Sequence, residues 1–279
     1  MVTRRDWLCA ATARLVGAGC EDAAFDARCL LEDLGGLARG HAADDTLLTA
    51  EQETALQTAL SQRAAGRPLQ YILGEWEFLA LTLKVGEGVL IPRPDTELLC
   101  EVAAAHLRGK LAPRVLDLCA GSGCVGLGVA SLHPAAQVTA VELSDAALGY
   151  LRQNVSRYPA YAVAVRQADV LADYAAFDGP YAAILSNPPY IPTADLPSLQ
   201  REVQHEPKMA LDGDGDGLKF YRAIAEHWCE KLAPDGFCAV EVGVGQAENV
   251  AALLAACGLE NTAIFKDAAG IPRVVLARK

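Results

Sequence analysis

The chain has 279 residues, 52% of them hydrophobic and 21% charged, which is typical of a globular protein with a sizeable core. Its net charge of −11 argues against a broad nucleic-acid-binding surface, because such surfaces depend on Lys and Arg. No apolar run is long enough to span a bilayer, and the nine cysteines lack the spacing of a zinc site, so we expect a cytoplasmic protein with reduced thiols, no metal and no membrane contact.

Residues 1–73 are predicted to form a small helical bundle. Apolar residues recur there at helical spacing, and the connections are short and polar. The predicted helices span residues 4–16, 22–34 and 49–64. The stripe expected to be buried in the second helix consists of Phe25, Cys29, Leu30 and Leu34.

Residues 74–92 are predicted to form a β-hairpin connector between the bundle and a larger domain at 93–279. A period-two alternation of apolar residues begins at Gln70–Gly74 and continues through residues 77–83. Pro92 and Pro94 close this region.

After Pro113 the sequence alternates between strand and helix patterns. The predicted strands lie at 115–118, 138–143, 162–166, 181–186, 237–242, 262–265 and 272–277. The predicted helices lie at 124–132, 144–157, 218–232 and 246–257. This order predicts a doubly wound α/β fold with a mostly parallel sheet, which binds its ligands at the carboxyl ends of the strands.

A Gly-rich turn follows the first of these strands. Residues 121–126 read Gly-Ser-Gly-Cys-Val-Gly, and Glu142 lies about 20 residues after the motif begins, at the end of the next strand. This arrangement favours a ligand that contains adenosine, with Glu142 bound to the ribose hydroxyls. A nicotinamide dehydrogenase is the rival interpretation.

Asp117 argues for a ligand without phosphate. It ends the first strand immediately before the turn, where a dinucleotide would place its pyrophosphate against the helix N-terminus. A carboxylate there would repel phosphate and favour a cationic amino group. S-adenosylmethionine carries an ammonium and a sulfonium but no phosphate, so it is the expected cofactor.

The strand at 181–186 runs directly into Asn187-Pro188-Pro189-Tyr190. The prolines stiffen this strand tip and remove two N–H donors, which leaves the Asn187 side-chain oxygen and the Pro188 carbonyl as acceptors. Together these acceptors can hold both hydrogens of a planar NH2 group and aim its nitrogen at a methyl donor. Tyr190 can stack on such a group. We therefore predict a methyltransferase acting on an amide or exocyclic nitrogen, with Asn187, Pro188 and Tyr190 as catalytic residues.

The Asn-Pro-Pro-Tyr segment resembles that of the class I methyltransferases that modify planar nitrogens, namely N6 of adenine and the side-chain amide of glutamine. Four other stretches resemble the bacterial HemK/PrmC family, which methylates the glutamine in the Gly-Gly-Gln loop of peptide chain release factors. They are residues 66–74, residues 90–97, residues 206–211 and Asp216-Gly217-Leu218 with Tyr221. Glu241-Val242-Gly243 with Gln246, and Asp267 with Gly270 and Arg273, also fit this family.

The resemblance implies a seven-stranded class I methyltransferase sheet and a bundle that recognises the substrate protein. It implies a cofactor site and a site for the substrate glutamine. The implied cofactor residues are Asp117, Cys119, Ala120, Gly121, Ser122, Gly123, Glu142, Asp169, Val170 and Asn187. The implied substrate residues are Arg93, Asn187, Pro188, Pro189 and Tyr190.

One position departs from the family pattern. Members often have Gly-Thr where this chain has Cys119-Ala120, so we expect ordinary backbone dihedrals at Cys119. This departure bears on the affinity for the cofactor and leaves the chemistry intact.

The expected partner is a class I release factor, without direct contact to nucleic acid. Three alternatives remain open: methylation of a glutamine in a ribosomal protein, methylation of adenine N6 in a nucleic acid, and an inactive, cofactor-retaining adaptor.

Overall fold

The computed structural model describes residues 2–279 and consists of two compact units. The first contains the residues up to Glu75 together with Gln200–His205, and the second contains Trp76–Leu199 together with Glu206–Lys279. A short segment from the second half of the sequence therefore belongs to the N-terminal unit.

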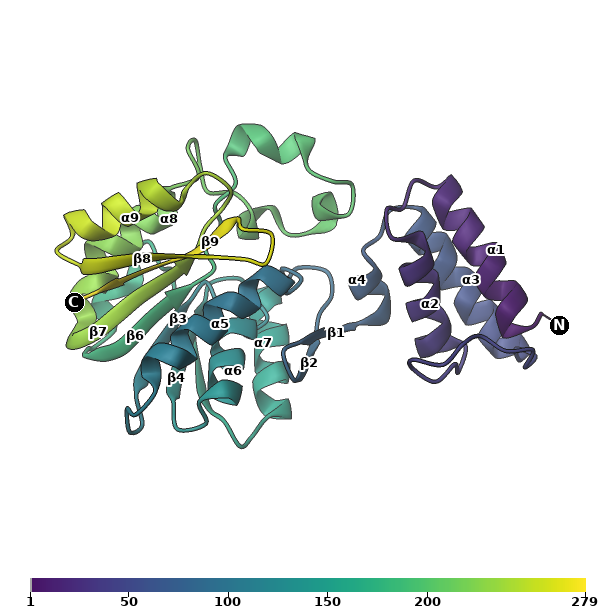
Figure 1. Ribbon diagram of the computed structural model, residues 1–279, viewed down its shortest axis with the longest axis horizontal. Coiled ribbons are helices and arrows are strands. Elements are labelled where there is room, and N and C mark those ends of the chain that lie inside the picture. Colours follow the sequence, from purple (N-terminus) through teal and green to yellow (C-terminus); the bar gives the residue numbers. More distant parts are fainter. Residues whose placement is uncertain (1) are drawn as a thin grey trace. The chain divides into compact units, whose positions relative to one another are not determined.

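The N-terminal unit is helical, as predicted (Figure 1). Its helices are α1 (Arg4–Gly17), α2 (Ala23–Leu34), α3 (Ala50–Ala64) and α4 (Leu69–Leu73). Thr49 caps α3 by accepting a hydrogen bond from the backbone N–H of Gln52, and the Gln52 side chain accepts one in return from Thr49. The first three helices confirm the predicted segments to within one residue at each end.

The predicted buried stripe of α2 is wrong at Phe25, whose side chain is exposed. The helix instead buries Asp26, because the Asp26 carboxylate accepts a hydrogen bond from Arg63 of α3 at 2.6 Å. Arg63 also bonds to Glu202 at 2.8 Å, which ties the segment Gln200–His205 to the unit. A buried ion pair between two helices has no signature in hydrophobic periodicity, so the pattern misplaced the inner face by about one residue.

The predicted strand character of Gln70–Gly74 is also wrong, because Leu69–Leu73 form α4. Pro68 precedes this helix, and Gly74 ends it with φ = 77°. The hairpin begins only after Gly74, with β1 (Glu75–Phe78) paired to β2 (Leu81–Lys84).

The second unit is built on a seven-stranded sheet, which confirms the predicted fold class. Its strands are β3 (Arg114–Leu118), β4 (Gln137–Glu142), β5 (Ala162–Gln167), β6 (Tyr181–Ser186), β7 (Leu232–Glu241), β8 (Glu260–Lys266) and β9 (Pro272–Arg278). They lie in the order β5-β4-β3-β6-β7-β9-β8. The strands from β3 to β7 are parallel, and β9 is antiparallel to both of its neighbours.

Helices cover both faces of this sheet. Successive residues of the central strands are therefore buried on opposite sides. One face packs against α5 (Pro94–Leu107), α6 (Cys124–Leu132) and α7 (Asp145–Arg157) (Figure 1). The other packs against α9 (Ala247–Ala256) and the helical region that begins with α8 (Lys219–Ala223). The sequence patterns missed α5.

The single helix predicted for residues 218–232 is interrupted. After α8 the chain forms a π-helical turn at Ile224–Trp228 and a 3-10 turn at Cys229–Lys231. Trp228 is fully buried there, and its indole N–H donates to the Val170 carbonyl at 2.9 Å. The irregular turns thus coincide with a large buried side chain that is hydrogen-bonded to the segment just after β5.

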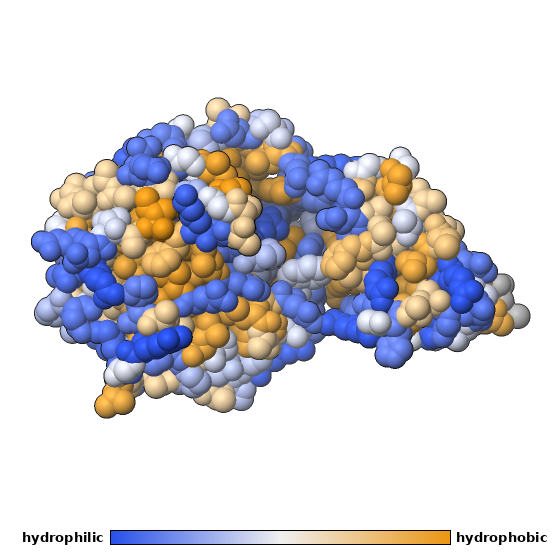
Figure 2. Space-filling model, viewed as in Figure 1, coloured by the Kyte–Doolittle hydropathy of each residue, from blue (hydrophilic) through white to orange (hydrophobic). Residues whose placement is uncertain are grey.

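Hydrophilic residues are spread over the visible face of both units (Figure 2). Among residues 2–279, no helix combines the length and the apolar composition needed to cross a membrane.

Asn154 of α7 joins the hairpin to the Gly-rich turn. Its side chain is fully buried, accepts from the Lys84 N–H at 2.6 Å, and donates to the carbonyls of Lys84 and Ser122 at 3.0 and 2.9 Å. These contacts reach three backbone groups at once, so the loss of the side chain would remove three hydrogen bonds from this region.

We expect Asn154→Ala to lower the free energy of unfolding by roughly 2–4 kcal/mol, because buried polar groups lose their partners. Chemical denaturation monitored by circular dichroism measures this change. The matched control is Gln153→Ala on the exposed side of the same helix, which should change stability by no more than about 0.5 kcal/mol. Equal effects of the two substitutions would contradict the anchoring role.

Candidate active site

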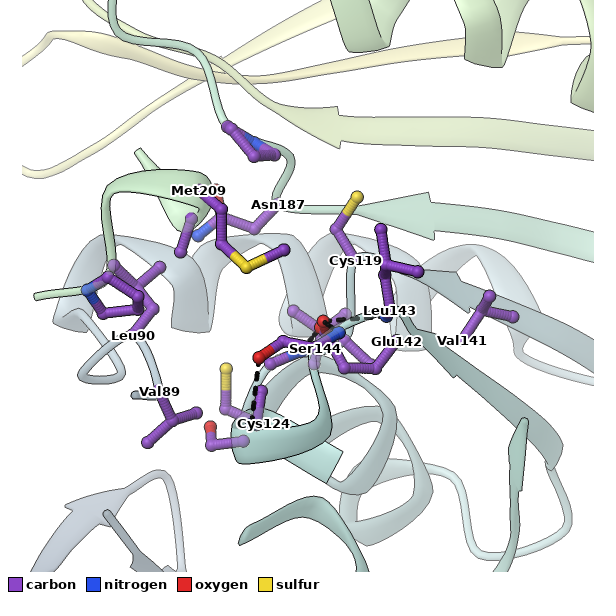
Figure 3. A pocket seen from close by; sticks show the side chains of 18 of the residues that line it. Val89, Leu90, Cys119, Cys124, Val141, Glu142, Leu143, Ser144, Asn187 and Met209 are labelled. Atoms are coloured by element: carbon purple, nitrogen blue, oxygen red, sulfur yellow. Dashed lines mark hydrogen bonds between the residues drawn. The ribbon is translucent and has the colours of Figure 1, made fainter. Parts of the chain in front are cut away.

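A cavity lies at the carboxyl ends of β3, β4 and β6. The strand order reverses between β3 and β6, and ligands of open α/β sheets bind at such a point. Val89, Leu90 and Met209 lie across the cavity from Cys119 and Glu142 (Figure 3). The lining combines apolar side chains with a few polar groups, as is common in small-molecule sites.

Many of the predicted cofactor residues line this cavity. They are Cys119, Ala120, Gly121, Ser122, Glu142, Asp169, Val170 and Asn187. Gly123 lies directly behind them as the residue before α6, with φ = 84°. The structure therefore brings together side chains from the ends of four strands.

The backbone of the Gly-rich turn corrects the expectation for Cys119. Its φ is +58°, so the residue adopts the left-handed conformation without being glycine. Gly121 also has positive φ, at 55°, and the Ala120 N–H donates to the Val141 carbonyl at 2.9 Å. Because Cys119 has a Cβ, its left-handed conformation costs about 1–2 kcal/mol relative to a glycine at this position.

The thiols beside the cavity are unreactive. Burial raises the pKa of Cys124 to about 12 and raises the pKa of Cys119 further. Both groups remain protonated near neutral pH and are not nucleophiles, since the thiolate is the reactive form. Cys119 and Cys124 thus contribute to the cavity by shape alone.

Glu142 is held at the end of β4 by three backbone donors. Its Oε1 accepts from the N–H groups of Leu143 and Ser144, and its Oε2 accepts from Gly121, each at 2.8 Å. A carboxylate oxygen has two lone-pair positions, so Oε2 can accept one further hydrogen bond. This oxygen lies on the cavity wall and is the group best suited to bind a ribose hydroxyl.

Asp117 does not line the cavity. It is fully buried, and its Oδ2 accepts from the N–H of Gly126 in the first turn of α6 at 2.9 Å. Burial raises the pKa of this carboxyl to about 7, so it is only partly ionised at neutral pH. Any repulsion of phosphate by Asp117 is therefore weaker than expected, and its observed contact is with the backbone of the turn.

Asn187 and Pro189 reach the cavity from the end of β6, whereas Pro188 is buried beside them. The Asn187 Nδ2 donates to the Thr96 hydroxyl oxygen at 3.1 Å. Thr96 is itself buried in the first turn of α5. The predicted strand tip is thus present, and its amide is fixed from one side.

Tyr190 lies beside the cavity wall in a tightly filled space. Its hydroxyl lies 3.5 Å from the Glu241 carboxylate, and its carbonyl accepts from Gln246 at 2.9 Å. A Cβ on Gly217 would overlap that carbonyl oxygen, and one on Gly243 would lie 3.0 Å from the ring. Burial raises the pKa of Tyr190, so its hydroxyl stays protonated.

Arg93 lines the cavity, but its guanidinium is paired with Glu206. The same Glu206 carboxylate, whose side chain is 1% exposed, accepts from the N–H of Ile91 at 2.9 Å. Glu206 therefore ties the next residues, of which Pro207, Met209 and Ala210 line the cavity, to the segment before α5. The sequence patterns singled out Arg93 but gave no role to Glu206 or Thr96, because neither has a sequence partner at motif spacing.

Two families of known domains match the sequence. Residues 6–74 match the PrmC N-terminal domain, and residues 94–217 match the methyltransferase small domain. The release factor glutamine methyltransferase of Bradyrhizobium diazoefficiens is 41% identical over 278 residues, which cover 96% of this chain and 92% of that protein. The protein of the same name from Geobacter sulfurreducens is 41% identical over 263 residues, with 93% and 91% covered.

Among solved structures, the crystal structure of a release factor-specific protein-(glutamine-N5) methyltransferase from Alicyclobacillus acidocaldarius is 33% identical. It covers 70% of this chain and 98% of that chain, with a TM-score of 0.45. The sequence matches confirm the predicted methyltransferase activity and S-adenosylmethionine as the cofactor. The chain belongs to the family of the release factor glutamine methyltransferases.

Proposed function

We propose that this protein transfers a methyl group from S-adenosylmethionine to the side-chain amide nitrogen of the glutamine in the Gly-Gly-Gln loop of release factors, acting in the cytoplasm during translation termination. The observation that supports this most directly is the Asn187 amide, held by Thr96 at the mouth of the cofactor cavity. A planar NH2 group is the chemical partner that such an amide and the neighbouring Pro188 carbonyl suit.

The residues of the cavity fit the cofactor. Glu142 retains one free acceptor position for a ribose hydroxyl, and Leu143 and Val170 offer apolar surface beside it. The backbone of the Gly-rich turn approaches closely because Gly121 adopts positive φ. When bound, S-adenosylmethionine supplies an electrophilic methyl group on a sulfonium.

The chain's own part in the reaction is to hold and polarise the substrate amide. An amide nitrogen attacks poorly because its lone pair is delocalised into the carbonyl. Hydrogen bonds from this NH2 group to the Asn187 oxygen and the Pro188 carbonyl would raise the electron density on nitrogen and fix its direction. The proton leaves easily once the nitrogen is alkylated, so no strong base is required in the site.

Tyr190 has a supporting part in this proposal. Its ring would pack against the planar amide, and its hydroxyl is engaged with Glu241. Arg93, paired with Glu206, would border the substrate side of the cavity.

The substrate can be tested directly with labelled S-adenosylmethionine, an intact release factor, ribosomal subunits and DNA. We expect label on the release factor, located by mass spectrometry to the glutamine of its Gly-Gly-Gln peptide. Label on a ribosomal protein or on adenine instead would replace the proposed substrate.

The same assay tests the proposed recognition role of the N-terminal unit. If that unit binds the substrate protein, kcat/KM should be clearly higher for the intact factor than for an isolated Gly-Gly-Gln peptide. Equal values would argue that the unit has another role.

Glu142→Ala should weaken binding of S-adenosylmethionine. The substitution removes a charge-assisted hydrogen bond worth roughly 1.5–3 kcal/mol, which corresponds to about 10- to 150-fold in Kd. Titration calorimetry measures the change, and NAD should not bind to either protein. The control is Asp145→Ala, which removes a nearby exposed carboxylate outside the cavity and should leave Kd almost unchanged.

Asn187→Ala should lower the rate of methyl transfer by roughly 10²-fold or more, in the range for loss of one preorganised polar group. The acceptor matters most in the transition state, because the substrate N–H becomes more acidic as nitrogen donates its lone pair. The affinity for S-adenosylmethionine should change little. Single-turnover transfer to a release factor provides the measurement, and near-normal transfer would refute the amide-holding mechanism.

A further inference from the structure

Glu241 is a buried carboxylate that the mechanism above leaves without a function. It is the last residue of β7, and its exposed fraction is 2%. In the parallel pairing of β6 with β7, Ser186 lies opposite Val240, so Asn187 and Glu241 are the next residues along two neighbouring strands. The sheet thus places this acid beside the amide proposed to hold the substrate.

Groups from several elements surround the Glu241 carboxyl. Burial, and to a smaller extent the nearby Asp95 carboxylate, raise the pKa of Glu241 to about 7. The Thr96 and Tyr190 hydroxyls and the Arg273 guanidinium oppose this rise. Arg273 is also paired with Asp95 and Asp267, at 2.8 and 2.9 Å. Within residues 2–279, the Oε2 of Glu241 lies buried without a partner that meets hydrogen-bond geometry. The ionised form of this carboxyl, which Thr96, Arg273 and Tyr190 favour, therefore has an oxygen available to accept from the Thr96 hydroxyl.

We propose that Glu241 and Thr96 are positioning residues that determine which way the Asn187 amide faces. A hydroxyl group can donate one hydrogen bond and accept others. In this arrangement Thr96 donates its hydrogen to the buried Glu241 carboxylate, whose Oε2 has no hydrogen-bond partner among the described residues, so only the Thr96 oxygen remains for Asn187. That oxygen accepts from Nδ2, so the Asn187 amide oxygen lies on the side away from this hydrogen bond and is left to accept from the substrate.

The orientation matters because the two ends of an amide differ in charge and in hydrogen bonding but hardly in size. If Asn187 turned over, its NH2 group would meet the NH2 group of the substrate, and the two donors would repel each other. Without a partner on the Thr96 side that can only accept, packing alone would distinguish the two orientations poorly. The carboxylate removes this ambiguity by assigning the direction of each hydrogen bond in turn.

Tyr190 is a second group held by the same acid. Its hydroxyl lies 3.5 Å from Glu241 Oε1, and the backbone carbonyl of Glu241 accepts from the Tyr221 hydroxyl at 2.8 Å. Glu241 thus contacts the Tyr190 end of the Asn187–Tyr190 segment. This inference rests on the proposed role of Asn187, so its test must separate the two.

The first test compares Thr96→Val with Thr96→Ser. Valine keeps the shape of threonine and removes the hydroxyl, whereas serine keeps the hydroxyl. Thr96→Val should lower the single-turnover rate by about 10- to 100-fold, the scale of a misplaced reacting group, and Thr96→Ser should recover most of it. The Kd for S-adenosylmethionine and the melting temperature should stay close to wild type in both. Equal rates for the two variants would overturn the proposal.

The second test is a double-mutant cycle with Asn187→Ala. If Thr96 acts through Asn187, then Thr96→Val should have almost no further effect on the rate once the Asn187 amide is gone. Additive losses would overturn the positioning role. If Asn187→Ala alone leaves the rate unchanged, the amide-holding mechanism itself fails. That outcome differs from additive losses, which would refute only the positioning role of Thr96.

A third variant tests the acid. Glu241→Gln keeps a similar shape, but its amide can both donate and accept, so it no longer assigns one direction to the Thr96 hydroxyl. We expect a loss of rate between those of Thr96→Ser and Thr96→Val, again without loss of cofactor affinity. A variant that is folded and as active as wild type would show that the carboxylate does not set the orientation.

Discussion

The Asn187–Tyr190 segment imposes the constraint around which the active site is arranged. Two consecutive prolines remove backbone donors at a strand end, so a sheet ladder cannot hold this segment. Side chains and close backbone contacts hold it instead: Thr96 accepts from the Asn187 amide, Gln246 donates to the Tyr190 carbonyl, and Gly217 leaves room for that carbonyl. The segment is rigid because distant parts of the chain converge on it.

This convergence explains why the stretches that resemble the family are scattered along the sequence. Residues 90–97 contribute Thr96, and residues 206–211 contribute the Glu206 carboxylate that is tied to Ile91 and Arg93. Glu241 and Gln246 reach Tyr190 from β7 and the turn before α9. Each stretch supports either the cavity wall or the strand tip, and few of these residues would touch a ligand themselves.

The sequence was sufficient for the features that depend on local pattern. Alternating strands and helices predicted the parallel sheet, and the Gly-rich turn with Glu142 predicted residues that line one cavity. Features that depend on contacts across the fold were not predictable. The ion pair between Asp26 and Arg63 rotated the inner face of α2, and the positive φ of Cys119 is imposed by the turn around it. Likewise, nothing near Thr96 in the sequence indicates that it pairs with Asn187.

The chain returns once to its N-terminal unit before it completes the second unit. Gln200–His205 belongs to the N-terminal unit, held there in part by Glu202 and Arg63, yet it lies between Leu199 and Glu206 of the second unit. Glu206 in turn anchors a segment of the cavity wall. A single stretch of chain therefore supplies an ion-pair partner within the N-terminal unit, at Glu202, and an anchor of the cavity wall, at Glu206.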